Sequence, residues 1–227
     1  MGEKGFTLIE LVVAMAIAGI VMAGMVAAYR QQTRSAANLG LRVVAQQNLR
    51  AGLYHLERDL RMAGADLTGR AYNGTLAIRT AEAGRVTLSW DDNSDGAISA
   101  DEVITYSLYA SSGMKTRNLG RSEGGARNQP VAQNIEAMDI HYFGRNATVP
   151  MARPVTGARR GEIRRVQVTL VGRSPAPLKF TRLGPTRVFR NPQGEAILVP
   201  PQDPFQRILL GSEVTLRNMG GIENHGN

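Results

Sequence analysis

GFTLIELVVAMAIAGIVMAGMVAA, residues 5–28, is the stretch that decides the architecture of this chain. Residues 11–28 contain no charged side chain, and these 18 residues are long enough for a membrane-spanning helix, which needs roughly 17–25. Glu10 interrupts the apolar run, although an ionisable group inside a membrane costs up to about 3 kcal/mol and normally has a partner. The stretch therefore predicts a membrane helix that carries one carboxylate with a specific role.

Two general interpretations of this segment leave something unexplained. A secretory signal peptide has a cationic region before a shorter apolar core, whereas Met1–Gly5 have no net side-chain charge and Glu10 disrupts the core. A plain membrane anchor explains the length of the run but provides no partner for Glu10.

A third interpretation accounts for Glu10. The sequence Gly5-Phe6-Thr7-Leu8-Ile9-Glu10 resembles the start of type IV prepilins and of type II secretion pseudopilins. The resemblance implies cleavage by a prepilin peptidase between Gly5 and Phe6, followed by N-methylation of Phe6. It also implies that Glu10 neutralises the N-terminal ammonium group of a neighbouring subunit during assembly. Physical chemistry agrees, because the helix dipole favours a carboxylate near the N-terminus and a buried charge needs a counter-charge.

The helix is expected to continue beyond the membrane. Leucines recur at spacings of four, three and four, which places them on one helix face: Leu49, Leu53, Leu56 and Leu60, with Leu39 and Val43 extending the stripe. Gly64 is the expected stop. A helix from Phe6 to Ala63 would be roughly 87 Å long at about 1.5 Å per residue.

The remainder of the chain has β-strand patterning, with short runs between Gly, Pro, Asn and Asp clusters. The expected strands are Thr75–Ile78, Arg85–Trp90, Val103–Tyr109, Ala137–Phe143, Ile163–Val171 and Glu213–Arg217; 111–129 and 144–160 are expected loops and 220–227 a frayed tail. We expect an α+β fold in which the long N-terminal α-helix packs on an antiparallel β-sheet head. The expected parts are a leader (1–5), a membrane and filament-core helix (6–28), an amphipathic helix (29–64) and a β-rich head (65–227).

The head narrows the resemblance to one group of pilins. Its segments 56–64, 131–136, 164–173 and 214–218 are similar to PilW-like minor pilins, and J-type minor pseudopilins share several of them. This implies a structural subunit that assembles with other pilins and that helps to initiate a pilus or sits near its tip. It also implies a bacterial inner-membrane location before assembly and a periplasmic or extracellular filament afterwards. A minor pseudopilin of a type II secretion system is the alternative.

A calcium-loop pattern lies in the head at residues 91–102. It matches the twelve-position EF-hand loop, with Gly96 at the sharp turn and these ligand positions: Asp91, Asn93, Asp95, Ala97 through its carbonyl, Ser99 and Glu102. Both flanks have strand patterning rather than helix patterning, so the expectation is an EF-like Ca²⁺ loop between two strands. The alternative is an ordinary Asp/Asn/Gly connection.

A basic stretch covers residues 145–190, where eleven Lys and Arg side chains accompany one acid, Glu162. The candidate anion- or DNA-binding residues are Arg159, Arg160, Arg164 and Arg165. A tip module that binds nucleic acid, an acidic polysaccharide or a neighbour's acidic loop is one interpretation. The other is a solvated surface whose arginine stems cover the sheet, which is favoured because no aromatic platform accompanies the arginines.

Composition excludes several further classes. The chain has 27 Lys and Arg against 19 Asp and Glu, a formal net charge of +8, which permits an anionic partner but selects none. It has no Cys, which excludes disulfides and thiolate chemistry. We find no hydrolase, zincin or P-loop motif and expect no enzyme activity. The acidic pair Glu57 and Asp59 is expected on the helix surface.

Overall fold

A computed structural model of the chain describes residues 5–66, 77–111, 116–179 and 187–219. One α-helix, α1 (Leu8–Met62), has 55 residues and is therefore roughly 83 Å long. Thr7 caps its N-terminus, and Gly64 follows its end with a φ of 74°, a conformation that favours glycine. The long continuous helix and its stop at Gly64 are confirmed. The leader residues 1–4 and the tail 220–227 lie outside the described residues.

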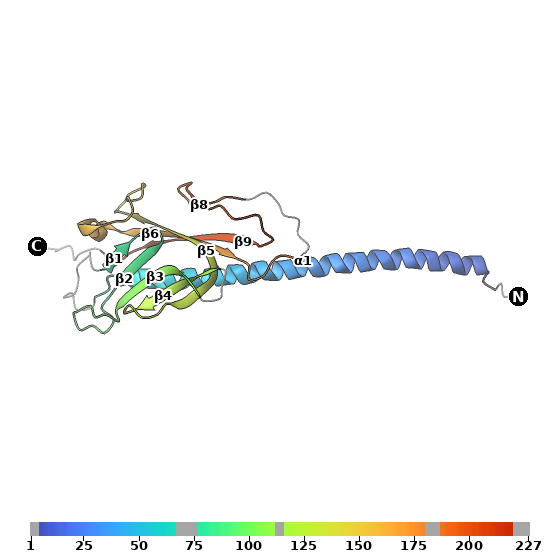
Figure 1. Cartoon of the computed structure of the whole chain (residues 1–227), viewed down its shortest axis with the longest axis horizontal. Coiled ribbons are helices and arrows are strands. Elements are labelled where there is room, and N and C mark those ends of the chain that lie inside the picture. Colours follow the sequence, from blue (N-terminus) through green and yellow to red (C-terminus); the bar gives the residue numbers. More distant parts are fainter. Residues whose placement is uncertain (1–4, 67–76, 112–115, 180–186, 220–227) are drawn as a thin grey trace, which may run out of the picture.

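The head is built on one curled antiparallel sheet whose strand order is β1-β2-β3-β4-β5-β6-β9. Its strands are β1 (Ile78–Ala81), β2 (Arg85–Ser89), β3 (Val103–Ala110), β4 (Arg117–Glu123), β5 (Gln129–Phe143), β6 (Arg165–Arg173) and β9 (Arg207–Thr215). A separate two-stranded sheet pairs β7 (Phe189–Arg190) with β8 (Ala196–Leu198), and a 3₁₀ helix, η1, spans Gly157–Glu162. The sheet packs against one face of the second half of α1, while the first half projects beyond the head (Figure 1). The predicted α+β fold is confirmed.

The core lies between the sheet and the leucine face of α1. Leu49, Leu56 and Leu60 are completely buried there and Leu53 is nearly so, as the spacing predicts. Close approach of helix and sheet depends on Gly52, because a Cβ at this position would lie 2.8 Å from the Cβ of Ala132 on β5. The N-terminal part of the predicted leucine stripe is not buried, because Leu39 is 60% exposed and Val43 is 49% exposed. The described head contacts the helix at this level through hydrogen bonds between Lys179 and Asn38, but it leaves these two side chains uncovered.

Several strand assignments were wrong. The predicted loop 111–129 contains β4, whose sequence RNLGRSE has little β patterning; Leu119 is its single large apolar side chain, and it is completely buried. Gly120 is required in β4 because a Cβ there would lie 2.7 Å from the ring of Tyr109. Strands β5 and β9 begin earlier than expected, and the hairpin β7–β8 was missed. Polar strands held by pairing on both sides lack the apolar runs on which the prediction relied.

One predicted loop of the head has no strand in the structure, and one predicted strand is only partly described. Segment 144–160 contains no strand, as expected, although η1 begins within it. Strand β1 begins at Ile78, and the residues 75–76 that were predicted to precede it in a strand lie outside the described residues.

The prediction that Asp59 lies on the helix surface is wrong, because its side chain is only 1% exposed. It accepts hydrogen bonds of 2.8 Å from the Tyr106 hydroxyl on β3 and from Arg121 Nε on β4, and it also pairs with Arg58. Burial, reinforced by the charge of Asp59, raises the pKa of Tyr106, which therefore stays protonated and donates. A buried carboxylate is tolerable only with such counter-charge and hydrogen bonding. The network ties the end of α1 to the middle of the sheet.

Candidate assembly segment, calcium loop and charged clusters

The start of α1 forms a reciprocal capping box between Thr7 and Glu10. Glu10 Oε2 accepts 2.8 Å hydrogen bonds from the backbone N–H and the hydroxyl of Thr7, while Thr7 Oγ1 accepts from the Glu10 N–H. Two backbone N–H groups at this helix end are thereby satisfied. The carboxylate thus folds back towards the Gly5–Phe6 bond, the predicted cleavage site, and Phe6 itself is 93% exposed. Gly5, Phe6 and Glu10 lie together at the free end of the helix.

The first half of α1 is an unpartnered apolar rod. By length and composition, α1 is the one helix among the described residues that can cross a membrane, with an 18-residue window of mean hydropathy 2.5 that is entirely unburied. Every residue from Gly5 to Ala37 is exposed, including Ile20 at 74%. Such a surface is unstable in water and requires lipid or other apolar helices around it.

The loop at residues 91–102 connects β2 to β3, so the predicted strand flanks are confirmed. Its Asp and Asn side chains accept hydrogen bonds from backbone N–H groups of the same loop, as in Asx turns. Asp91 accepts hydrogen bonds from the backbone N–H groups of Asp95 and Gly96, and Asn93 Oδ1 also accepts from the Asp95 N–H at 2.9 Å. Asp95 Oδ1 accepts from the N–H of Ala97 at 2.8 Å.

Glu102 closes this loop from its far end. One carboxylate oxygen accepts from the backbone N–H groups of Asp92 and Asn93, and the other accepts from the N–H and hydroxyl of Ser99 at 2.8 Å. The Ser99 backbone N–H is the largest influence that lowers the pKa of Glu102, so its charged form is favoured. Asp91 and Glu102 are only 4% and 5% exposed, and neither has a basic partner among the described residues. The predicted ligand side chains are thus brought together around one loop.

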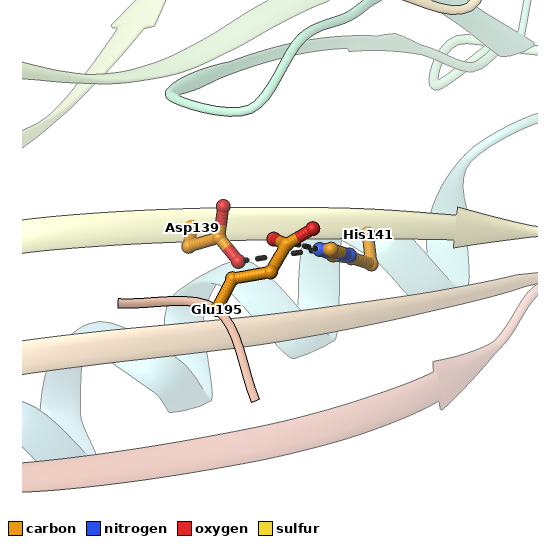
Figure 2. Close-up of side chains that lie close together, drawn as sticks. All are labelled: Asp139, His141 and Glu195. Carbon is orange, nitrogen blue, oxygen red and sulfur yellow. Dashed lines mark ion pairs between the residues drawn. The ribbon is translucent and has the colours of Figure 1, made fainter. Parts of the chain in front are cut away.

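A second cluster that the sequence did not reveal contains Asp139, His141 and Glu195 (Figure 2). His141 Nε2 lies 3.2 Å from Glu195 Oε2 and 3.5 Å from Asp139 Oδ2. One potential metal-ligand atom from each residue lies within 4.8 Å of the others, so the group can hold a metal ion. Asp139 and His141 share a face of β5 by their spacing of two, but Glu195 follows β7 and is remote in sequence.

The carboxylates of this cluster already have partners in the chain. Arg153 Nη1 lies 2.5 Å from Asp139 Oδ1, and Arg153 Nη2 lies 3.1 Å from Glu195 Oε2. The Asn191 amide donates to Asp139 Oδ2 at 2.8 Å and to Glu195 Oε2 at 2.9 Å. His141 Nδ1, by contrast, is buried without a partner, whereas metal-binding histidines usually donate through their second nitrogen. The arrangement therefore fits an ion-pair network that fastens the β7–β8 hairpin to β5.

The predicted basic residues do not form one surface. Arg159 lies 3.9 Å from Glu162 in an exposed pair, and Arg160 donates to the carbonyl oxygen of Arg79. Arg164 and Arg165 instead line a cavity at the ends of β5, β6 and β9. Phe180 and Arg182 of the basic stretch lie outside the described residues.

Comparisons with known proteins agree with the N-terminal geometry. Residues 1–26 match the family described as the prokaryotic N-terminal methylation motif. No curated protein sequence matches the chain. Among solved structures, a type IV-like pilin from Thermus thermophilus is similar, with 14% identity and a TM-score of 0.47 over 77% of this chain and 98% of that chain. That likeness is too distant to add to the argument.

The motif at residues 1–26 and the helix-on-sheet geometry together support one class, that of type IV pilin-like prepilins. Members of this class are structural subunits rather than enzymes. They are processed by a prepilin peptidase and assemble with other pilins, and the apolar half of α1 is consistent with membrane insertion before assembly.

The His141 cluster predicts that the head is sensitive to acid. Burial and then the charge of Arg153 lower the pKa of His141, against the opposing charges of Asp139 and Glu195. The unfolded chain therefore binds the proton more readily, so this stability is complete above about pH 6.5 and is lost as pH falls towards the lower folded-state pKa. Denaturant unfolding of the detergent-solubilised chain at pH 7.5 and 5.5 should show a smaller loss for His141→Gln than for wild type. An equal loss in both, or an equal effect of the control His55→Gln on α1, contradicts this assignment.

Proposed function

We propose that this chain is a minor type IV pilin, a PilW-like structural subunit that helps to initiate the pilus and lies near its tip. The observation that carries the proposal is the N-terminal half of α1: an apolar rod, exposed along its whole length, that ends in a Thr7–Glu10 capping box beside a prepilin cleavage motif. No surface of the described head covers this rod. It therefore needs the bilayer first and neighbouring helices afterwards.

Glu10 is the group that would set the register between subunits. Cleavage after Gly5 leaves a new ammonium group at Phe6, within a helical turn of Glu10 in the same chain. When subunits pack side by side, the environment of this carboxylate becomes apolar, and a buried charge without a counter-charge is strongly destabilising. The ammonium of an adjacent subunit supplies that counter-charge. Hydrophobic burial drives the association, and the ion pair selects the correct stagger.

The minor-subunit assignment is supported by the head. The segment at 56–64 that resembles PilW-like minor pilins forms the end of α1, where Leu56, Asp59 and Leu60 are anchored in the sheet. The head contains no Cys, so this anchoring takes the place of the disulfide that often closes the head of a major pilin. A minor pseudopilin of a type II secretion system is compatible with the same features, and the neighbouring genes would separate the two.

Removing the Glu10 carboxylate should stop assembly without unfolding the head. We expect Glu10→Ala to remain in the inner membrane, to be cleaved, and to lose at least about 90% of its incorporation, because desolvation of an unpaired ammonium opposes packing. Immunoblotting of sheared filaments against membranes measures this. Glu3→Ala is the matched control, because Glu3 belongs to the leader that processing removes. Normal incorporation of Glu10→Ala would contradict the proposed role.

We further propose that the loop at residues 91–102 binds Ca²⁺. The support is the EF-like spacing together with two buried carboxylates, Asp91 and Glu102, that lack a basic partner among the described residues. The ligands would be the side chains of Asp91, Asn93, Asp95, Ser99 and Glu102 with the Ala97 carbonyl. Bound calcium would offset the mutual repulsion of the carboxylates and so order the connection between β2 and β3.

Calcium should stabilise the head only while Glu102 is intact. At a free concentration of 100 times the dissociation constant, a ligand adds about 2.7 kcal/mol to the free energy of unfolding. We expect this gain in wild type, measured by denaturant unfolding in Ca²⁺ against a chelator, and its loss in Glu102→Gln. The control Asp101→Asn removes an adjacent carboxylate that is not a predicted ligand. An equal calcium response in wild type and Glu102→Gln would exclude this loop as the site.

A further inference from the structure

A cavity of about 480 Å³ lies at the end of the head that is farthest from the apolar half of α1. Residues from three strand ends line it: Gly144–Thr148 after β5, Arg164 and Arg165 at the start of β6, and Thr215 and Leu216 at the end of β9. Two hydrogen bonds place this cavity close to the C-terminal end of α1. The Leu216 N–H donates to the Arg164 carbonyl at 2.8 Å, and Asn218 Nδ2 donates to the Arg61 carbonyl at 3.0 Å.

The cavity has an excess of positive charge. Arg145 is exposed and has no hydrogen bond or ion pair among the described residues. Arg164 donates through Nη1 to the carbonyl oxygens of Gly161 and Ile163, which leaves its charge without a carboxylate partner. Arg165 is the one lining arginine with an acid beside it, Glu213 at 3.1 Å. Three guanidinium groups and one carboxylate leave a surplus of two positive charges.

This surplus contrasts with the pairing of three other arginines in the head. Arg121 pairs with Asp59 and Glu123, Arg153 with Asp139 and Glu195, and Arg207 with Glu136 and Asp203. Each of these guanidinium groups lies between two carboxylates. The head therefore has acids available for its arginines, but it places only Glu213 at the cavity. Arg164 Nε is in addition buried without a partner.

We propose that this cavity binds a phosphate monoester, with Arg145 and Arg164 as the charge-matching groups. A phosphate monoester carries about −1.5 to −2 charges at pH 7, which matches the surplus better than a single carboxylate does. The planar guanidinium fork suits phosphate oxygens, and the amide of Asn146 and the hydroxyls of Thr148 and Thr215 line the same space. Small-molecule sites commonly measure roughly 300–1,000 Å³, so the cavity has room for an organic group attached to the phosphate.

A small phosphate fits the geometry better than a nucleic acid strand. A strand follows a continuous positive track. Beside the cavity, however, Arg159 pairs with Glu162, and Arg160 is bound to the carbonyl of Arg79. The positive charge is thus concentrated at one concave point instead of extending along a stripe. The biological use of the pocket rests on the proposed function, because only a subunit at the tip leaves this end of its head open to the outside.

Calorimetric titration of glycerol 3-phosphate into the full chain in maltoside micelles tests the proposal. We expect saturable binding to wild type that sodium acetate at equal ionic strength does not reproduce. Arg145→Gln should weaken this binding at least about tenfold, since a charge-assisted hydrogen bond is worth at least one order of magnitude. Arg145 makes no hydrogen bond or ion pair among the described residues, so this variant should fold normally. The matched control is Arg127→Gln, which removes another exposed arginine, from the β4–β5 turn, and should leave the affinity unchanged.

Three outcomes would overturn the proposal: no binding beyond that of acetate, equal weakening by Arg127→Gln, or binding of a single-stranded oligonucleotide without binding of glycerol 3-phosphate. The titration needs no filament, so its failure is distinct from failure of the proposed pilin role. If Glu10→Ala assembled normally, the proposed role of Glu10 would be wrong while the pocket remained. If the titration failed, the pilin role would stand without this ligand.

Discussion

The structure depends on one constraint: an apolar helix half, exposed along its length, must be surrounded at every stage by something other than water. In the proposed function, the bilayer would meet this requirement before assembly, and neighbouring helices would meet it afterwards. In this proposal a single carboxylate, Glu10, would make this non-directional requirement specific, because it can be buried only beside a positive charge. The capping box with Thr7 holds that carboxylate in place at the helix end.

The second half of α1 differs from the first, because the sheet covers one of its faces. Leu49, Leu56 and Leu60 are completely buried, and Gly52 allows close approach to β5. The Asp59–Tyr106–Arg121 network adds polar specificity near the helix end. The head is therefore fixed to a rigid helix, so that the orientation of this helix also positions the 91–102 loop and the cavity at the ends of β5, β6 and β9.

The features that were predictable from sequence are local in the chain. The cleavage motif, the leucine face and the 91–102 loop each occupy one continuous stretch, and periodicity or spacing reveals them. Long-range effects were not predictable: Asp59 has acidic helix-surface patterning but meets β3 and β4, and Glu195 joins His141 only through folding. Strand β4 was missed because its polar residues are held by pairing with β3 and β5. Arg164 and Arg165 were identified, but their convergence with Arg145 required the sheet.

The most direct test of the central claim is the intact mass of the protein isolated from its native membrane. The account predicts a chain that lacks residues 1–5 and carries one added methyl group on Phe6. Such a mass would show that the motif at residues 1–26 is processed as a prepilin. A full-length, unmethylated chain in cells whose other prepilins are processed would contradict it and reduce α1 to a membrane anchor.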